Sequence, residues 1–187
     1  MHPEGTVIYE YEDEESFPVS HLSVFLEVRD DARYSESLTV TCVSSKYRWF
    51  CDDLVIYETD GVNYAGATSI FMPENMPFTS GEYEVIYRSL SDETDKGYFY
   101  VSSYSALAEI KASEVEEFMK ERNGKKKIAV YDSEDKLIYF GLYSDVPDPF
   151  YSFSNAQSYR VVWTVSNSVM CLLPLQEKWY NKAIWTL

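Results

Sequence analysis

The chain has 187 residues, of which 45% are hydrophobic and 25% charged, and these proportions exclude a disordered or collagen-like protein. Its 31 acidic and 16 basic residues give a formal net charge of -15, which repels phosphate groups and argues against nucleic acid and anionic membranes as partners. No run approaches the roughly 18 apolar residues of a membrane-spanning helix. Aromatic residues make up 17% of the chain, and because they favour pleated sheets, we expect a mainly β fold.

Residues 1–19 are predicted to be a lead-in to the fold. They combine the strand-like run TVIYEY with an acidic block at 12–15 and Pro18, which is typical of a mobile segment or an edge strand. The segment lacks the charged start, apolar middle and small-residue cleavage site of a secretory signal. Two locations therefore stay open: export or the cell envelope if a signal has been removed, and otherwise the cytoplasm.

Residues 20–103 are predicted to form a β-sandwich, because short β-rich runs are separated by turn residues at roughly 8 to 12 residue spacing. Asp60-Gly61 is a tight-turn signal between two of these runs. Alternation along the runs predicts a core made of Leu22, Val24, Leu26, Val28, Leu38, Val40, Cys42, Tyr47, Trp49, Cys51, Tyr83, Val85, Tyr87, Phe99 and Val101.

Cys42, Trp49 and the pattern Gly81-x-Tyr83-x-Val85 occur in this order, and the arrangement resembles an immunoglobulin-like or fibronectin type III-like domain. The resemblance implies an antiparallel β-sandwich in which the Tyr83 hydroxyl bonds back to the chain at a corner. Val85 stands where antibody domains have their second cysteine, so the resemblance does not extend to their inter-sheet disulfide.

Residues 104–187 are predicted to be a smaller α+β region, with one helix followed by antiparallel strands. Ser113 and Glu116 have the spacing of a capping box, and Gly124 is expected to end the helix. Val115, Phe118 and Met119 form the apolar stripe of this helix. The strands are expected at 127–132, 136–143, 158–175 and 182–187, with turns at 133–135 and near Asn167-Ser168.

Catalytic motifs are not evident in the sequence. His2 and His21 are the only histidines, and no Gly-rich phosphate loop or HExxH zinc motif is present. Acidic pairs such as Asp52-Asp53 are frequent, but sequence spacing does not report the separation that a glycosidase requires. We therefore assign no catalytic residue and expect a protein that is not an enzyme.

One possible metal site and one possible disulfide remain open. Asp92 and Asp95 lie in a loop with Gly97, and oxygen ligands around such a turn suit Ca²⁺; the alternative is a hairpin loop made acidic for solubility. No other cofactor is expected. Cys42 and Cys51 are expected to be buried free thiols or a disulfide pair, since alternation places them on the same side of their strands.

Aromatic residues near turns are the candidate ligand contacts. They are Tyr57 and Tyr64 beside the Asp60-Gly61 turn, and Phe150, Tyr151 and Phe153 in the run DPFYSF; the alternative is that they fold back into the core. The sequence thus predicts a non-enzymatic interaction or structural module of an exported or cell-envelope protein, with protein or glycan contacts. The alternative function is a carbohydrate-binding or carbohydrate-hydrolysing domain that uses aromatic and acidic residues. The oligomeric state is not indicated.

Overall fold

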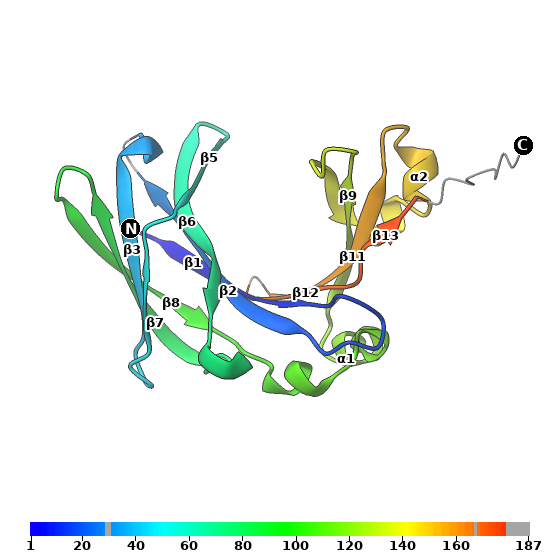
Figure 1. The fold of residues 1–187 in the computed structure, drawn as a ribbon, viewed down its shortest axis with the longest axis horizontal. Coiled ribbons are helices and arrows are strands. Elements are labelled where there is room, and N and C mark those ends of the chain that lie inside the picture. The colour runs from blue at the N-terminus through cyan, green and yellow to red at the C-terminus, as the bar shows by residue number, and fades with distance from the viewer. Residues whose placement is uncertain (29–30, 167, 179–187) are drawn as a thin grey trace, which may run out of the picture.

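The computed structural model describes residues 1–28, 31–166 and 168–178. Two sheets dominate it (Figure 1). The larger sheet contains β1 (Pro3–Glu10), β2 (Val19–Val28), β5 (Val55–Thr59), β6 (Val62–Phe71), β9 (Lys125–Tyr131), β10 (Leu137–Leu142), β11 (Ser158–Val165), β12 (Val169–Leu172) and β13 (Gln176–Glu177). The smaller sheet contains β3 (Ser35–Cys42), β4 (Arg48–Cys51), β7 (Gly81–Ser89) and β8 (Thr94–Val101).

Helical segments are short. The α-helices are α1 (Val115–Lys120) and α2 (Pro149–Ser152), and the 3₁₀ turns are η1 (Ala32–Tyr34), η2 (Pro73–Asn75), η3 (Ser105–Glu109), η4 (Ala112–Glu114) and η5 (Tyr143–Asp145). The expected mainly β fold is therefore confirmed, and the two sheets are compatible with a β-sandwich.

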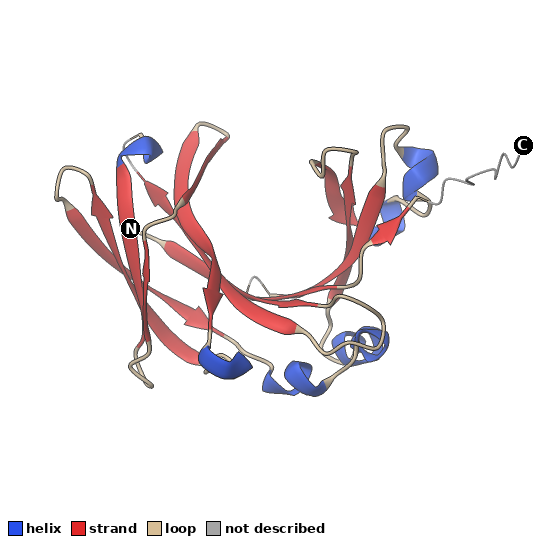
Figure 2. Cartoon of the chain, in the orientation of Figure 1, coloured by secondary structure: helices blue, strands red, loops and turns tan. Residues whose placement is uncertain are grey.

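The larger sheet is mixed and curved. Its order is β10-β9-β11-β12-β1-β2-β6-β5, with β13 paired to β11, and β1 and β12 run parallel to each other. The sheet bends into an arch: the smaller sheet covers the convex side of one arm, and η3 and α1 lie below the middle (Figures 1 and 2). In the part of the chain that the structure describes, no helix or strand lies against the concave side.

Alternation correctly predicted most of the core between the sheets. Leu22, Val24 and Leu26 of β2 face Leu38 and Val40 of β3, and each is at most 1% exposed. Three exceptions lie on or beside the short edge strand β4: Trp49 and Cys51 are half-buried and Tyr47 is 39% exposed. An edge strand of this length has no neighbour on its outer side to complete the burial of its side chains. The fourth is Tyr87 of β7, which is half-buried.

The first strand differs from the expectation. β1 lies between β2 and β12 in the interior of the larger sheet, and Val7, Tyr9 and Tyr11 are fully buried. The Tyr9 hydroxyl donates to the carbonyl oxygen of Tyr104 over 3.2 Å. A mobile lead-in or an edge strand is therefore wrong for residues 3–10. The domain boundaries near residues 19 and 103 stay a prediction, and one continuous sheet crosses both of them.

The helix begins differently from the capping prediction. The capping contact belongs to the preceding turn η4, where the Glu114 Oε2 accepts a hydrogen bond from the backbone N–H of Lys111 over 3.2 Å. Glu116 instead forms ion pairs with Lys120 at 2.6 Å and Lys126 at 2.7 Å. Glu114 and Glu116 both have a spacing that suits a capping box, and the side chain of Glu116 is held by its two lysine ion pairs instead.

The end of α1 is close to the prediction. The Gly124 N–H donates to the Met119 carbonyl oxygen over 2.8 Å, and the Asn123 N–H donates to that of Lys120 over 3.1 Å. This pair of bonds is a Schellman motif. Its left-handed residue is Asn123, with φ of 56°, rather than Gly124.

Turn predictions can be compared directly. Asp60 and Gly61 have φ of 52° and 76° and connect β5 to β6, as expected. The turn at 133–135 joins β9 to β10, also as expected. Asn167 of the third expected turn and the expected strand at 182–187 lie outside the described residues.

All three cysteines are free thiols. In the β3–β4 ladder Cys51 lies opposite Leu38, so Cys42 is four residues further along β3. Four residues of strand span about 13 Å, whereas a disulfide requires Cα atoms within about 7 Å. The free-thiol alternative is therefore confirmed and the Cys42–Cys51 pair is excluded.

Candidate functional site

A groove of about 1100 Å³ opens between the two sheets at the end of one arm. Leu26 and Val28 of β2 form part of its apolar lining. Tyr34, Tyr87 and Leu90 contribute from η1 and the end of β7. β2 and β7 belong to different sheets, and the groove lies between their ends.

Two tyrosines give the groove its aromatic character. Tyr34 is 60% exposed, and its carbonyl oxygen accepts a hydrogen bond from the N–H of Leu90 over 2.8 Å. The Tyr87 hydroxyl lies 3.2 Å from the hydroxyl of Ser35. Tyr34 is thus held at the backbone while its ring remains available for contact.

Carboxylates surround these rings, and the described residues that line the groove include no Lys or Arg. The acidic residues are Glu27, Asp31, Glu93 and Asp95. Hydrogen bonds from Arg33 beside the groove lower the pKa of Asp31 to about 2, and the Asp95 Oδ2 lies 3.5 Å from the amino nitrogen of Met1. The groove therefore has a negative field that favours cationic or hydroxyl-rich ligands.

A second depression of about 510 Å³ adjoins the groove and shares Asp31 with it. Tyr57 lines it, together with Ile56 and Glu58 of the same strand. The rings of Tyr57 and Tyr64 stack with centroids 5.0 Å apart. The structure thus brings these two predicted contact residues together, near the groove, and Tyr57 remains 42% exposed.

The other predicted aromatic contacts lie in and after α2, on the opposite arm (Figure 1). Phe150 packs edge-on against Tyr159 with centroids 5.5 Å apart, and Phe153 packs against Tyr139 at 5.1 Å. Tyr151 between them is 89% exposed. Phe150 and Phe153 are half-buried and pack against a small hydrophobic cluster, and Tyr151 is the exposed member of this set.

Of the predicted Ca²⁺ ligands, Asp92 lies in the β7–β8 connection and Asp95 lies in β8, where it lines the groove. Asp92 forms an ion pair with Arg88, and Asp95 Oδ1 accepts a hydrogen bond from the N–H of Lys96 over 2.7 Å. Among the described residues, no group of three or more His, Cys, Asp or Glu side chains could hold a metal ion. Ca²⁺ prefers six to eight oxygen ligands, so these two residues alone do not make a site, and binding stays a prediction.

Sequence reasoning did not single out Tyr34 or Glu93. The usable signal for Tyr34 is Asp31, whose side chain accepts a hydrogen bond from the N–H of Arg33 over 3.0 Å and so caps η1. An aspartate three residues before a tyrosine is common, which is why this signal alone does not identify a contact residue.

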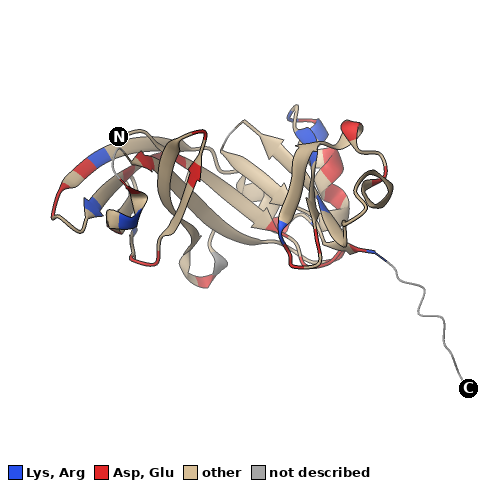
Figure 3. Cartoon of the chain, turned by 90° about the horizontal axis from the view of Figure 1, so that it is seen from above, with Lys and Arg blue, Asp and Glu red and all other residues tan. Residues whose placement is uncertain are grey.

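No protein-family model matches the chain, and a search of curated proteins finds no significant similarity. Among the described residues, none of the helices has the length and apolar character needed to cross a membrane. Figure 3 shows that acidic residues gather at the hairpin tips and that little charge lies along the middle of the larger sheet. The function is therefore inferred from the geometry of the groove and its surroundings.

Proposed function

We propose that the chain is a non-enzymatic interaction module of an exported or cell-envelope protein, and that it binds a protein or a glycan in the groove between the sheets. The observation that carries this proposal is the exposed ring of Tyr34 beside Glu93 and Asp95, with no Lys or Arg in the described lining. A tyrosine ring supplies apolar contact area at low entropic cost, and the carboxylates select for positive charge or hydroxyl groups.

We further propose that residues 20–103 have an immunoglobulin-like arrangement, and two contacts support this. The Tyr83 hydroxyl donates to the Thr79 carbonyl oxygen over 2.9 Å, as the hydroxyl of a tyrosine corner does. The Trp49 ring stacks on Tyr83 with centroids 6.4 Å apart. Such sandwiches commonly act through surface contacts, and the proposed location rests on this resemblance alone.

Carbohydrate binding, with or without hydrolysis, is the second candidate. Glu93 and Asp95 are two residues apart at the start of β8 and both line the groove with Tyr34. An aromatic ring that stacks on a sugar, with carboxylates that accept its hydroxyl hydrogens, is a suitable sugar site. Hydrolysis would in addition require one of the two carboxyl groups to act as an acid.

The experiment compares Tyr34→Ala with Tyr151→Ala, which removes a similarly exposed tyrosine from the other arm. Both variants and the unaltered chain are screened against a glycan array and a displayed library of basic peptides. We expect Tyr34→Ala to lower the affinity for the selected ligand by about tenfold, or about 1.4 kcal/mol. Tyr151→Ala should leave this affinity unchanged. Equal loss or no loss in both variants would contradict the groove as the site.

Salt separates the two ligand classes. Binding of a basic peptide should weaken as ionic strength rises, because salt screens its attraction to the carboxylates. Binding of a neutral glycan should change little.

A further inference from the structure

The larger sheet ends in β5, a strand whose five residues are all exposed. Val55, Ile56 and Tyr57 are 43%, 41% and 42% exposed, although they point alternately to the two faces of the sheet. Apolar side chains on both faces of an edge strand are unfavourable in water, and an added strand would bury part of them. It is the kind of edge to which another strand adds.

The register of the β5–β6 ladder shows which backbone groups of β5 are not used by β6. Thr59 pairs with Val62 across the two-residue turn, and the residues that flank such a turn form a hydrogen-bonded pair. Bonded positions then alternate, so Tyr57 also bonds to β6. The N–H and C=O groups of Ile56 and Glu58 must point away from the sheet, spaced to receive an added strand.

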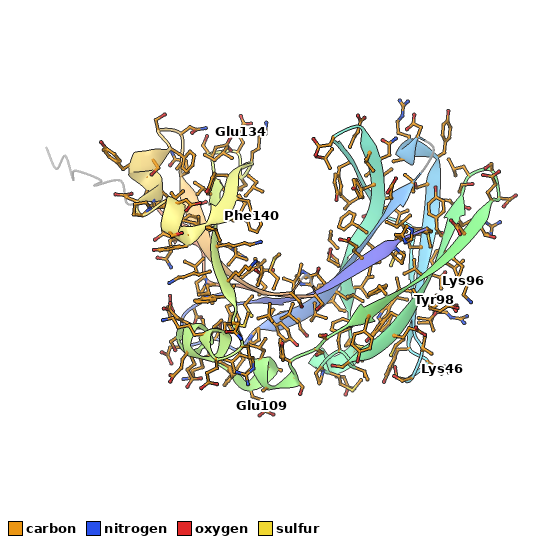
Figure 4. All side chains as sticks on the ribbon, turned by 180° about the vertical axis from the view of Figure 1, so that it is seen from behind. Lys46, Lys96, Tyr98, Glu109, Glu134 and Phe140 are labelled. Atoms are coloured by element: carbon orange, nitrogen blue, oxygen red, sulfur yellow. The ribbon has the colours of Figure 1, made fainter. Side chains whose placement is uncertain are left out.

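The other three edges of the two sheets, within the described residues, carry features that discourage pairing. The register of β10 shifts between Leu137 and Tyr139, and β4 has four residues. On the outer face of β8, Lys96 and Tyr98 project outward (Figure 4), and Lys96 pairs with Glu84 at 2.5 Å. The β5 ladder has no register shift, and the strand VIYET has no proline or lysine.

The chemistry around β5 indicates the partner. Asp52 and Asp53 precede the strand, Glu58 lies in it and Asp60 follows it. On the concave face Tyr57 contacts Phe25 and Tyr64 with ring centroids 5.3 and 5.0 Å away. An incoming strand would thus meet aromatic rings on one face and carboxylates along its length. Arg33 of η1 also lies beside Ile56 and Glu58, where it forms an ion pair with Asp31.

We propose that β5 accepts an extended segment of another protein, in which lysine or arginine alternates with apolar residues, as an added strand of the larger sheet. Main-chain bonds to Ile56 and Glu58 supply affinity, and the acidic flanks select basic residues. A second copy of the chain fits less well, because it would bring two acidic strands of a protein with net charge -15 together. This edge borders the depression that shares Asp31 with the groove, but Tyr34→Ala and Ile56→Pro change different residues, so either proposal can fail alone.

The test uses the whole chain and two seven-residue peptides, one alternating lysine with valine and tyrosine, the other with glutamate in place of lysine. Ile56→Pro removes an N–H that β6 does not use, so the β5–β6 hairpin can be retained. Ile56→Ala is the matched control, because it removes the side chain and keeps the N–H. Affinity is measured by fluorescence polarisation, and circular dichroism checks the folding of each variant.

We expect the lysine peptide to bind at least about tenfold more tightly than the glutamate peptide. Ile56→Pro should lower the affinity for the lysine peptide by about tenfold more than Ile56→Ala does. In the unaltered chain, the lysine peptide should also slow hydrogen exchange at the amides of Ile56 and Glu58, a readout that does not depend on the proline variant folding. Equal affinity for both peptides, or unchanged exchange at these amides, would overturn the proposal. So would dimerisation of the chain that Ile56→Pro abolishes, because the occupant would then be a second copy.

Discussion

At the scale of single residues, two tryptophans differ in whether the indole N–H has a hydrogen-bond partner. Trp163 is buried and Trp49 is half-buried against the core. The Trp49 Nε1 donates to the Phe71 carbonyl oxygen over 2.9 Å and so joins the two sheets. The Trp163 Nε1 is buried without a hydrogen-bond partner among the described residues. A buried donor of this kind costs about 1 to 3 kcal/mol. This cost offsets part of the stabilisation that comes from burying the Trp163 ring.

Replacing each tryptophan by phenylalanine tests this difference. Trp49→Phe should lower the free energy of unfolding by about 1 kcal/mol, because it removes the bond to Phe71. Trp163→Phe should change it less, because the small cavity is offset by loss of the unsatisfied donor. Urea unfolding measures both, and a larger loss for Trp163→Phe would show that its N–H has a partner or that its packing dominates.

Single strands are the scale at which β1 can be tested. Gly5 lies on the buried face of β1, and a Cβ there would overlap the ring of Phe99, which stacks on Tyr83 at 5.5 Å. Gly5→Ala should therefore destabilise the protein by about 1 to 3 kcal/mol. Glu4→Ala, next to it but exposed, should cost less than about 0.5 kcal/mol. Thermal melting of the two variants distinguishes an interior β1 from a loose one, for which both changes would be mild.

The same strand shows how far sequence reasoning reached. Local patterns sufficed for the burial of Leu22 and Val24 and for the Asp60-Gly61 turn, because alternation and turn preference depend on neighbouring residues. The place of β1 depends on β12 at the other end of the chain, and no local pattern encodes that pairing.

The candidate site shows the same division. Tyr57 and Tyr64 could be predicted as a pair because they flank one turn. The groove could not, because it joins β2, η1 and the β7–β8 connection, and their proximity results from the tertiary fold. For Phe150 and Phe153 the sequence left two alternatives, and their ring contacts with Tyr159 and Tyr139, distant in sequence, could not be predicted from it.

The whole molecule depends on one sheet that runs from β10 to β5. Separating residues 1–103 from the rest would remove β12 from β1 and uncover a strand edge beside the buried Val7 and Tyr9. We therefore expect the chain to unfold in one cooperative transition, with calorimetric and van 't Hoff enthalpies in a ratio near about 1. Two resolved transitions in scanning calorimetry would instead favour separate domains at 20–103 and 104–187.

The parallel pairing of Val7–Glu10 with Val169–Leu172 also has a consequence for synthesis of the chain on the ribosome. β1 can pair with β2 early, but its second neighbour, β12, exists only after residues 169–172 have been made. Until then one edge of β1 has no partner, and contacts this distant in sequence form slowly. The larger sheet should thus be the last part of the protein to close, and a nascent chain would need protection at β1 during that delay.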